Sequence, residues 1–341
     1  MRILHTSDWH ININATRMGK PSTSAVTRSQ RLIALRYVIQ YGIDNGATVF
    51  VIAGDVFDKA QPWGQDYADL ISILDMIPDT SIILMIFGNH DEFTTKGAGL
   101  QAIKERRNNI FIALELETFS HKGYNFILAP WGSKLDDIRN IIDGTKYPCI
   151  LVLHGGVKDE NHHWVEVEGE EGNYHLDDLK ALGCKAIMLG HYHNQAELAP
   201  GIWYAGSPDN VHGFSEESDT KGALLWDIGE KVTQISTTPL IPNYHTFTPE
   251  EFLGDDGTNN HFTGYIRIKG EVDDKERLQI LKKLSDYKCL DYKVDLTNKT
   301  KKVRVFELKG NTDQEILENY FAQKGIKDTK ELLKLDKELS K

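Results

Sequence analysis

Apolar and polar positions alternate in two different ways along the first 200 residues. Apolar, β-branched runs at 47–53 and 81–87 fit buried strands. Between the apolar runs, segments 28–44 and 66–76 carry apolar side chains at helical spacing. Repeated strand–loop–helix units of this kind predict a layered α/β fold. Further strands are predicted at 2–7, 124–129, 149–153 and 185–189.

After residue 200 the pattern changes to strands without long helices, at 202–205, 223–227 and 232–237. The stretch 239–249 contains Pro and Asn and is predicted to be a linker. Beyond it a strand at 263–269, a helix at 274–287 and strands at 292–296 and 302–308 form a small βαβ-like unit. We therefore predict domains at 1–238, 239–310 and 311–341.

The C-terminal segment, residues 311–341, is predicted to form two short helices. Thr312 and Glu315 have the spacing of a capping box, and Gly325 would end the first helix. Each helix would carry an apolar face, which either docks on the chain itself or binds a partner. The two faces consist of Ile316, Leu317, Tyr320 and Phe321, and of Leu332, Leu333, Leu335 and Leu339.

Residues that can bind metal ions follow five of the predicted strands. The carboxyl ends of strands in layered α/β folds meet where ligands bind, so these residues are expected to converge. Taken singly, each segment has an ordinary explanation as a turn, a cap or a core histidine; their joint occurrence in order argues for one site. The segments are Asp-Trp-His at 8–10, Gly-Asp-Val-Phe-Asp at 54–58, Gly-Asn-His-Asp at 88–91, His-Gly-Gly at 154–156 and Gly-His-Tyr-His at 190–193.

The chemistry of these segments indicates two metal ions. They offer carboxylate, imidazole and amide groups without thiolate, which suits Mn²⁺, Fe or Zn²⁺ better than a structural zinc site. There are more ligands than one ion needs. Two ions about 3.5–4 Å apart that share a carboxylate are the usual arrangement in phosphatases and nucleases. A metal-bound water would then be the nucleophile, so no Ser or Cys nucleophile is required.

Charge and composition restrict the partners and the compartment. The net charge of −11 argues at first against nucleic acid. However, residues 265–309 carry 13 Lys and Arg against 8 Asp and Glu, a balance of +5, and a basic segment can supply phosphate contacts. The three cysteines are widely spaced and fit single thiols in a reducing compartment. Without a membrane-length apolar run or a signal peptide, the expected location is the cytoplasm of a bacterial or phage-infected cell.

The motifs, in their order, resemble the calcineurin-like metallophosphoesterases. The subgroup they most resemble is the SbcD-type DNA repair nuclease, the bacterial and phage relative of the nuclease subunit of the MRN complex. This resemblance rests on the segments 5–10, 52–58 and 204–208, with Lys221-Gly222 beyond them, and covers the first 230 residues. It implies a four-layer α/β/β/α sandwich with a small α+β cap domain and a C-terminal helical tail.

The resemblance also implies residue roles. His90 would be the catalytic histidine, and Asp91 would either orient it or cap the loop. Asp58 stands where some family members have a histidine that contacts substrate. One ion would be held by Asp8, His10 and His193 and the other by Asn89, His154 and His191, with Asp55 bridging them.

The resemblance to this family also implies a substrate, a preferred metal and partners. The family prefers manganese, degrades double-stranded DNA as an exonuclease and cuts single strands as an endonuclease. It works with an SbcC-type coiled-coil ATPase, bound by C-terminal helices, and it forms homodimers. Two alternatives are a phosphatase or small-molecule phosphodiesterase on the same core, and a non-catalytic scaffold. The presence of all the ligands argues against the scaffold, and the additional domain and tail argue against a small substrate.

Overall fold

The computed structural model describes most of the chain. It covers residues 1–13, 21–59, 62–91, 100, 103–104, 106–158, 173–255, 264–287 and 289–299. The predicted strand at 302–308 and the predicted tail at 311–341, with its capping box and apolar faces, lie outside the described residues.

The first of two large sheets has the strand order β14-β13-β1-β2-β3-β4. Strands β1, β2, β3 and β4 lie next to one another and are parallel. Strand β13, from much later in the chain, pairs antiparallel with β1, and β14 pairs antiparallel with β13. The strands are β1 (Arg2–Thr6), β2 (Val49–Ala53), β3 (Ile82–Ile86), β4 (Ile110–Ala113), β13 (Gly222–Asp227) and β14 (Lys231–Ser236).

The second sheet has the order β11-β12-β10-β7-β6-β5, with parallel strands in the middle and an antiparallel strand at each edge. Its strands are β5 (Glu117–His121), β6 (Tyr124–Ala129), β7 (Cys149–His154), β10 (Ala186–Gly190), β11 (Ala196–Ala199) and β12 (Ile202–Tyr204). A separate two-stranded ribbon pairs β8 (Gly156–Lys158) with β9 (Asn173–His175).

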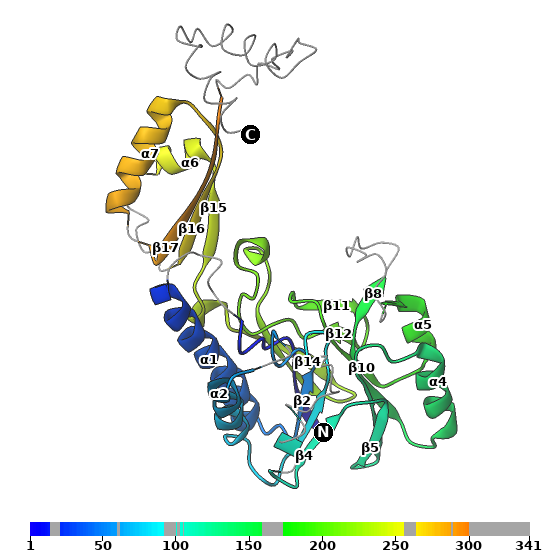
Figure 1. Cartoon of the computed structure of the whole chain (residues 1–341). Helices are drawn as coiled ribbons and strands as arrows, with labels where there is room; N and C mark the ends of the chain where they lie inside the picture. Colours follow the sequence, from blue (N-terminus) through cyan, green and yellow to red (C-terminus); the bar gives the residue numbers. More distant parts are fainter. Residues whose placement is uncertain are drawn as a thin grey trace, which may run out of the picture.

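The two sheets face each other, and helices cover their outer faces (Figure 1). Helices α1 (Pro21–Asp44) and α2 (Gly64–Leu74) cover the first sheet, and α4 (Leu135–Gly144) and α5 (Leu176–Ala181) cover the second. Alternate residues of β2 are apolar on both faces of the sheet, so both faces must be covered. Phe50 and Ile52 pack against the helices, whereas Val49 and Val51 pack between the sheets. The predicted four-layer α/β/β/α sandwich is confirmed.

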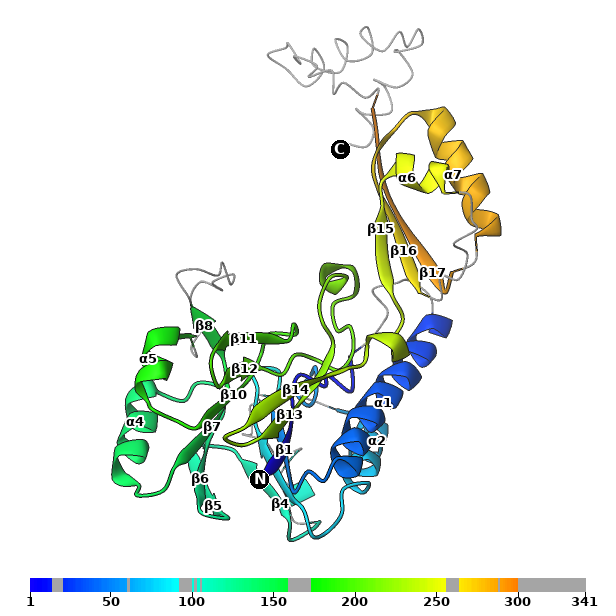
Figure 2. The ribbon, with the colours of Figure 1, turned by 180° about the vertical axis from the view of Figure 1, so that it is seen from behind.

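A third, three-stranded parallel sheet stands beyond the amino end of α1 (Figures 1 and 2). Its strands are β15 (Tyr244–Phe247), β16 (Tyr265–Val272) and β17 (Asp291–Asn298), covered by α6 (Pro249–Gly254) and α7 (Asp274–Asp286). A separate cluster that includes Phe252, Ile268 and Leu284 forms its core. Helix α7 starts at a capping box between Asp273 and Glu276.

The prediction of a plain linker at 239–249 is wrong in part, because residues Tyr244–Phe247 form β15. Four residues are too few for a recognisable alternation, and the flanking Pro and Asn residues hide the strand. Among the described residues, no helix combines the length and apolarity needed to cross a bilayer.

Candidate metal centre

The loops that follow β1, β2 and β10 share an unusual backbone. Asp8, His10 and Asp55 have φ of 54°, 43° and 52°, and His191 has φ of 111°. In the described chain only one other non-glycine residue, Lys122, has a positive φ. Such conformations cost free energy and gather at functional sites. Backbone hydrogen bonds of 3.0 Å from Asp8 N to Gly54 O and from His10 N to Asp55 O hold the first two loops together.

One group of side chains comprises Asp8, His10 and His193, whose candidate ligand atoms lie within 4.8 Å of one another. His193 Nε2 is 3.8 Å from Asp8 Oδ1, and His10 Nε2 is 3.6 Å from Asp55 Oδ2. His10 is fully buried, and its Nε2 has no hydrogen-bond partner among the described residues. A buried nitrogen left without a partner in this way fits a metal ligand.

A second group comprises Asp8, Asp55 and His154, and Asn89 and His191 adjoin it. His154 Nε2 lies 3.5 Å from Asp55 Oδ2 and 3.1 Å from Asn89 Oδ1. His191 Nδ1 lies 3.1 Å from the same Asn89 oxygen. Because Asp55 Oδ2 faces both His10 and His154, its carboxylate connects the two groups, which also have Asp8 in common.

The tautomer of His154 shows that a positive charge belongs here. Its Nδ1–H donates to Ala53 O at 2.7 Å, so in the neutral ring Nε2 carries only a lone pair. That lone pair faces the oxygens of Asp55 and Asn89, which also act as acceptors. Either a proton or a metal cation must lie between them.

The titration behaviour agrees with this picture. Burial lowers the pKa of His154, but the Asp55 charge and hydrogen bond outweigh burial and raise it to about 9. Burial likewise opposes ionisation of Asp55, whereas His154 and His10 hold its pKa well below the usual range. Burial and the neighbouring His154 lower the pKa of His191 to about 4. The oxygen and nitrogen donors therefore fit divalent cations, and the seven predicted ligands lie together.

His90 lies at the exposed side of this centre. Its backbone N–H donates to Asp55 Oδ1 at 2.9 Å, and its ring packs edge-on against His10 with the centroids 4.8 Å apart. Nδ1 of His90 lies 3.0 Å from the backbone oxygen of Asp58 and 3.8 Å from Asp58 Oδ1. The side chain is 37% exposed, which leaves it open to a substrate.

Asp91 contacts the backbone. Its buried carboxylate accepts hydrogen bonds from the N–H groups of Val56, Phe57 and Gly88. Burial and the Asp55 charge raise its pKa to about 7, against these three bonds. These contacts fasten the loop after β3 to the loop after β2, as a loop cap does. The aspartate that meets Nδ1 of the His90 ring is Asp58 rather than Asp91.

Glu216, a buried carboxylate that contacts the ring of His193, was not identified from the sequence. Glu216 Oε1 lies 2.5 Å from His193 Nδ1, and Glu216 Oε2 lies 2.8 Å from Nζ of the fully buried Lys221. Despite burial, His193 and Lys221 hold the pKa of Glu216 well below its usual value. A carboxylate behind a histidine fixes the ring and strengthens it as a metal ligand. Glu216 carries no motif of its own, so only the Lys221-Gly222 pair was a signal near it.

The comparison with family models decides the family: the model described as calcineurin-like phosphoesterase matches residues 1–195. The chain belongs to the calcineurin-like phosphoesterase family. The matched range contains every predicted metal ligand of this phosphoesterase and ends two residues beyond His193.

Three curated relatives are similar over most of the phosphoesterase. Exonuclease subunit 1 of Enterobacteria phage T4 is 23% identical over 90% of this chain and 80% of its own length. The D component of the nuclease SbcCD from Staphylococcus epidermidis is 23% identical over 71% of this chain and 70% of its own. The DNA double-strand break repair protein Mre11 of Halobacterium salinarum is 25% identical over 75% of this chain and 65% of its own.

Proposed function

We propose that this phosphoesterase is the nuclease subunit of a DNA repair or recombination complex and hydrolyses DNA phosphodiesters with two Mn²⁺ ions. The observation that carries the proposal is that two donor groups meet at Asp55, whose Oδ2 lies 3.6 Å from His10 Nε2 in one group and 3.5 Å from His154 Nε2 in the other. Two-ion sites with a shared carboxylate hydrolyse phosphoesters. The choice of DNA is supported by relatives named exonuclease, nuclease and DNA break repair protein.

The proposed assignment gives each ion ligands from both sheets. Asp8, His10 and His193 would hold one ion, and Asn89, His154 and His191 would hold the other. Asp55 would contribute to both. When bound, the cations supply a water molecule of lowered pKa and neutralise charge on the phosphoryl oxygens.

The protein's own groups orient the ligands and move a proton. Nδ1–H of His90 donates to the Asp58 carbonyl oxygen, which leaves Nε2 as the nitrogen available to the substrate. In its imidazolium form the ring would give the Nε2 proton to the leaving oxygen. Glu216 fixes the His193 ring through Nδ1. Asp91 keeps the His90 loop in register through the backbone N–H groups of Val56, Phe57 and Gly88, and is therefore a positioning residue.

The remaining parts of the chain suit a DNA-processing role. We propose that residues 239–310, with the +5 balance at 265–309, form the cap that contacts DNA. The relatives include one component of SbcCD, which supports a partner; we assign to the tail at 311–341 the binding of an SbcC-type ATPase. We further propose a homodimer, double-strand exonuclease and single-strand endonuclease activity, and action inside the cell.

The deciding assay compares two substrates. The purified chain is incubated with Mn²⁺ and either linear DNA or a small aryl phosphodiester, with and without a coiled-coil ATPase encoded beside it. We expect cleavage of DNA. Hydrolysis of the aryl ester with no DNA cleavage in any mixture would instead identify a phosphatase or small-molecule phosphodiesterase. If neither substrate reacts although metal is bound, the protein is a scaffold.

A further inference from the structure

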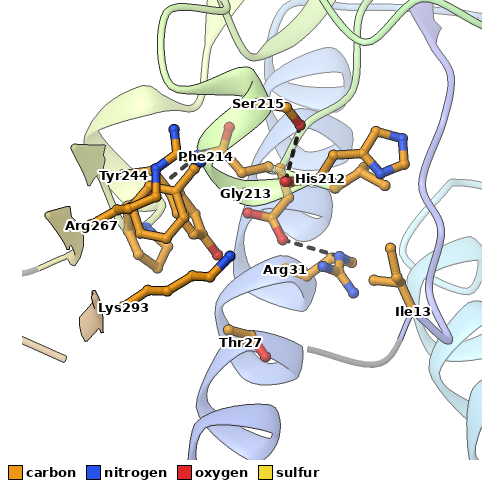
Figure 3. Close-up of a pocket in the computed structure, with 14 residues that line it drawn as sticks. Ile13, Thr27, Arg31, His212, Gly213, Phe214, Ser215, Tyr244, Arg267 and Lys293 are labelled. Carbon is orange, nitrogen blue, oxygen red and sulfur yellow. Dashed lines mark hydrogen bonds and ion pairs between the residues drawn. The ribbon is translucent and has the colours of Figure 1, made fainter. Parts of the chain in front are cut away.

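A cavity of about 250 Å³ lies between the phosphoesterase core and the three-stranded sheet (Figure 3). The core contributes Arg31 from α1 and the segment 209–215, and the sheet contributes Tyr244, Arg267 and Lys293. The cavity is thus built from parts of the chain that are far apart in sequence. Its volume suits a single nucleotide rather than a duplex.

The lining of the cavity is positively charged, although the whole chain is acidic. Arg31, Arg267 and Lys293 line it together with one carboxylate, that of Asp209. Lys293 Nζ also lies 3.2 Å from Oδ2 of Asp295, at the half-exposed edge of the sheet. Arg31 is 4% exposed, and its Nε lies 3.0 Å from Asp209 Oδ2. Figure 3 shows Lys293 reaching in from the sheet toward the side occupied by Arg31. Three cations around a space of this size provide a site for a phosphate group.

The same cavity offers a surface for a base. Phe214 and Tyr244 meet edge to face with their ring centroids 5.1 Å apart, and the Arg267 guanidinium lies 4.9 Å from the Phe214 ring centre. Aromatic rings beside a cationic groove are the usual platform for bases of single-stranded nucleic acid.

The cavity adjoins the metal centre. The His212 ring, in the cavity wall, stacks on the ring of the ligand His193 with the centroids 4.9 Å apart. On the same side, Arg31 Nη1 lies 3.4 Å from the backbone oxygen of the ligand His10. A strand whose phosphodiester lies on the metal centre could therefore place its neighbouring nucleotide in the cavity.

We propose that this cavity is a nucleotide subsite that holds the phosphate and base of the nucleotide next to the scissile bond in single-stranded DNA. The inference rests on the proposed nuclease function and specifies its substrate. The phosphate lies among Arg31, Arg267 and Lys293, and the base packs on Phe214 and Tyr244.

Binding is measured with a short, fluorescently labelled, single-stranded phosphorothioate oligonucleotide, which resists hydrolysis, in the presence of Mn²⁺. Lys293→Ala and Arg267→Ala each remove one cation from the cavity. The matched control is Lys146→Ala, which removes the same charge from an exposed position outside both the cavity and the proposed DNA-contacting cap. Lys293 is half exposed, so its substitution should leave the fold intact, as a melting curve will verify.

We expect each cavity variant to weaken oligonucleotide binding about tenfold, the effect of losing one charge-assisted contact. The control should remain within about twofold, because the charge it removes contacts no nucleotide in the subsite. The KM for a cleavable oligonucleotide should rise in parallel, while kcat/KM for the aryl phosphodiester stays unchanged. The subsite is refuted if the cavity variants bind the oligonucleotide as the control does, even when wild-type protein cleaves DNA. A different result is that wild type does not cleave DNA but its oligonucleotide binding still depends on Lys293 and Arg267. This result refutes the nuclease function and supports the subsite.

Discussion

His90 combines an exposed ring with a fixed orientation, since its Nδ1 meets the Asp58 carbonyl oxygen while its backbone N–H holds Asp55. A histidine placed to donate a proton is expected to contribute about 10²–10⁴-fold to the rate. We predict that His90→Asn lowers cleavage by that factor and leaves the metal content unchanged. Rate measurements and elemental analysis on the same preparation check this.

Metal content is the informative control, because His90 also lies within ligand distance of His10 and Asp55. Loss of metal together with activity would make His90 a ligand rather than the proton donor. Full activity in the variant would remove it from the mechanism.

Glu216 acts through His193, so its substitution should affect the metal before the chemistry. Glu216→Gln is predicted to weaken Mn²⁺ binding about 10–100-fold, as loss of a carboxylate behind a metal-binding histidine does. The adjacent Glu217→Gln is the matched control, because Glu217 Oε2 accepts from Thr246 Oγ1 instead. Calorimetric titration measures both affinities; equal affinities would show that Glu216 only supports the fold around Lys221.

The pKa of His154 determines whether the affinity for metal rises or falls with pH. With its pKa raised to about 9 in the metal-free protein, the ring is protonated at neutral pH and must release that proton before Nε2 can bind a cation. Mn²⁺ affinity should therefore rise with pH up to about 9. Titrations in two buffers with different ionisation enthalpies count the protons released. No release at neutral pH would contradict the protonated state.

At the scale of elements, the glycines after β2 and β3 let strand ends approach closely. A Cβ on Gly88 would lie 2.0 Å from Asp55 Oδ1 and 2.5 Å from Asp55 N, and neither the buried Asp55 carboxylate nor its backbone can move away freely. We predict that Gly88→Ala weakens Mn²⁺ binding at least about tenfold and destabilises the metal-free chain by about 1–3 kcal/mol. Metal titration and urea unfolding measure the two effects.

Gly144, at the end of α4, is the control, since a Cβ there meets nothing within 4 Å. Gly144→Ala should bind metal normally and unfold at the same or a slightly higher urea concentration. If the two variants behave alike, the close approach at Gly88 is not what fixes Asp55.

The strands that carry ligands were predictable because they are buried on both faces and read as continuous apolar runs, as in Val49–Ala53 and Ile82–Ile86. Some elements were not predicted, among them β4 with four residues, α5 with six and α4 with ten. The donor segments are local motifs and could be found in the sequence. The Glu216 contact could not, because its 23-residue separation from His193 is closed only by the tertiary fold.

For the whole molecule, the metal centre gathers buried carboxylates and histidines at the junction of the two sheets, so a cation should stabilise the domain. Ligand linkage gives about 2.7 kcal/mol when free Mn²⁺ is 100 times its Kd. We predict a higher melting temperature in Mn²⁺ than in chelator, measured by calorimetry. Asp55→Asn, which lacks the carboxylate charge proposed to bridge the two ions, should lose most of this difference. Identical melting of wild type in both solutions would show that the centre binds no metal.

The order of the strands in the first sheet also bears on how the chain is synthesised. Strand β13, which pairs with β1, is encoded after the whole second sheet. Asp8 and His191, which meet in the centre, are 183 positions apart. A nascent chain on the ribosome therefore makes the carboxylates long before the last histidines. It cannot complete one proposed ion site until residue 191 has emerged, or the other until residue 193 has. Metal loading must then follow translation of the domain, and a product terminated before His191 would be an apo fragment whose unpaired β1 edge invites degradation or aggregation.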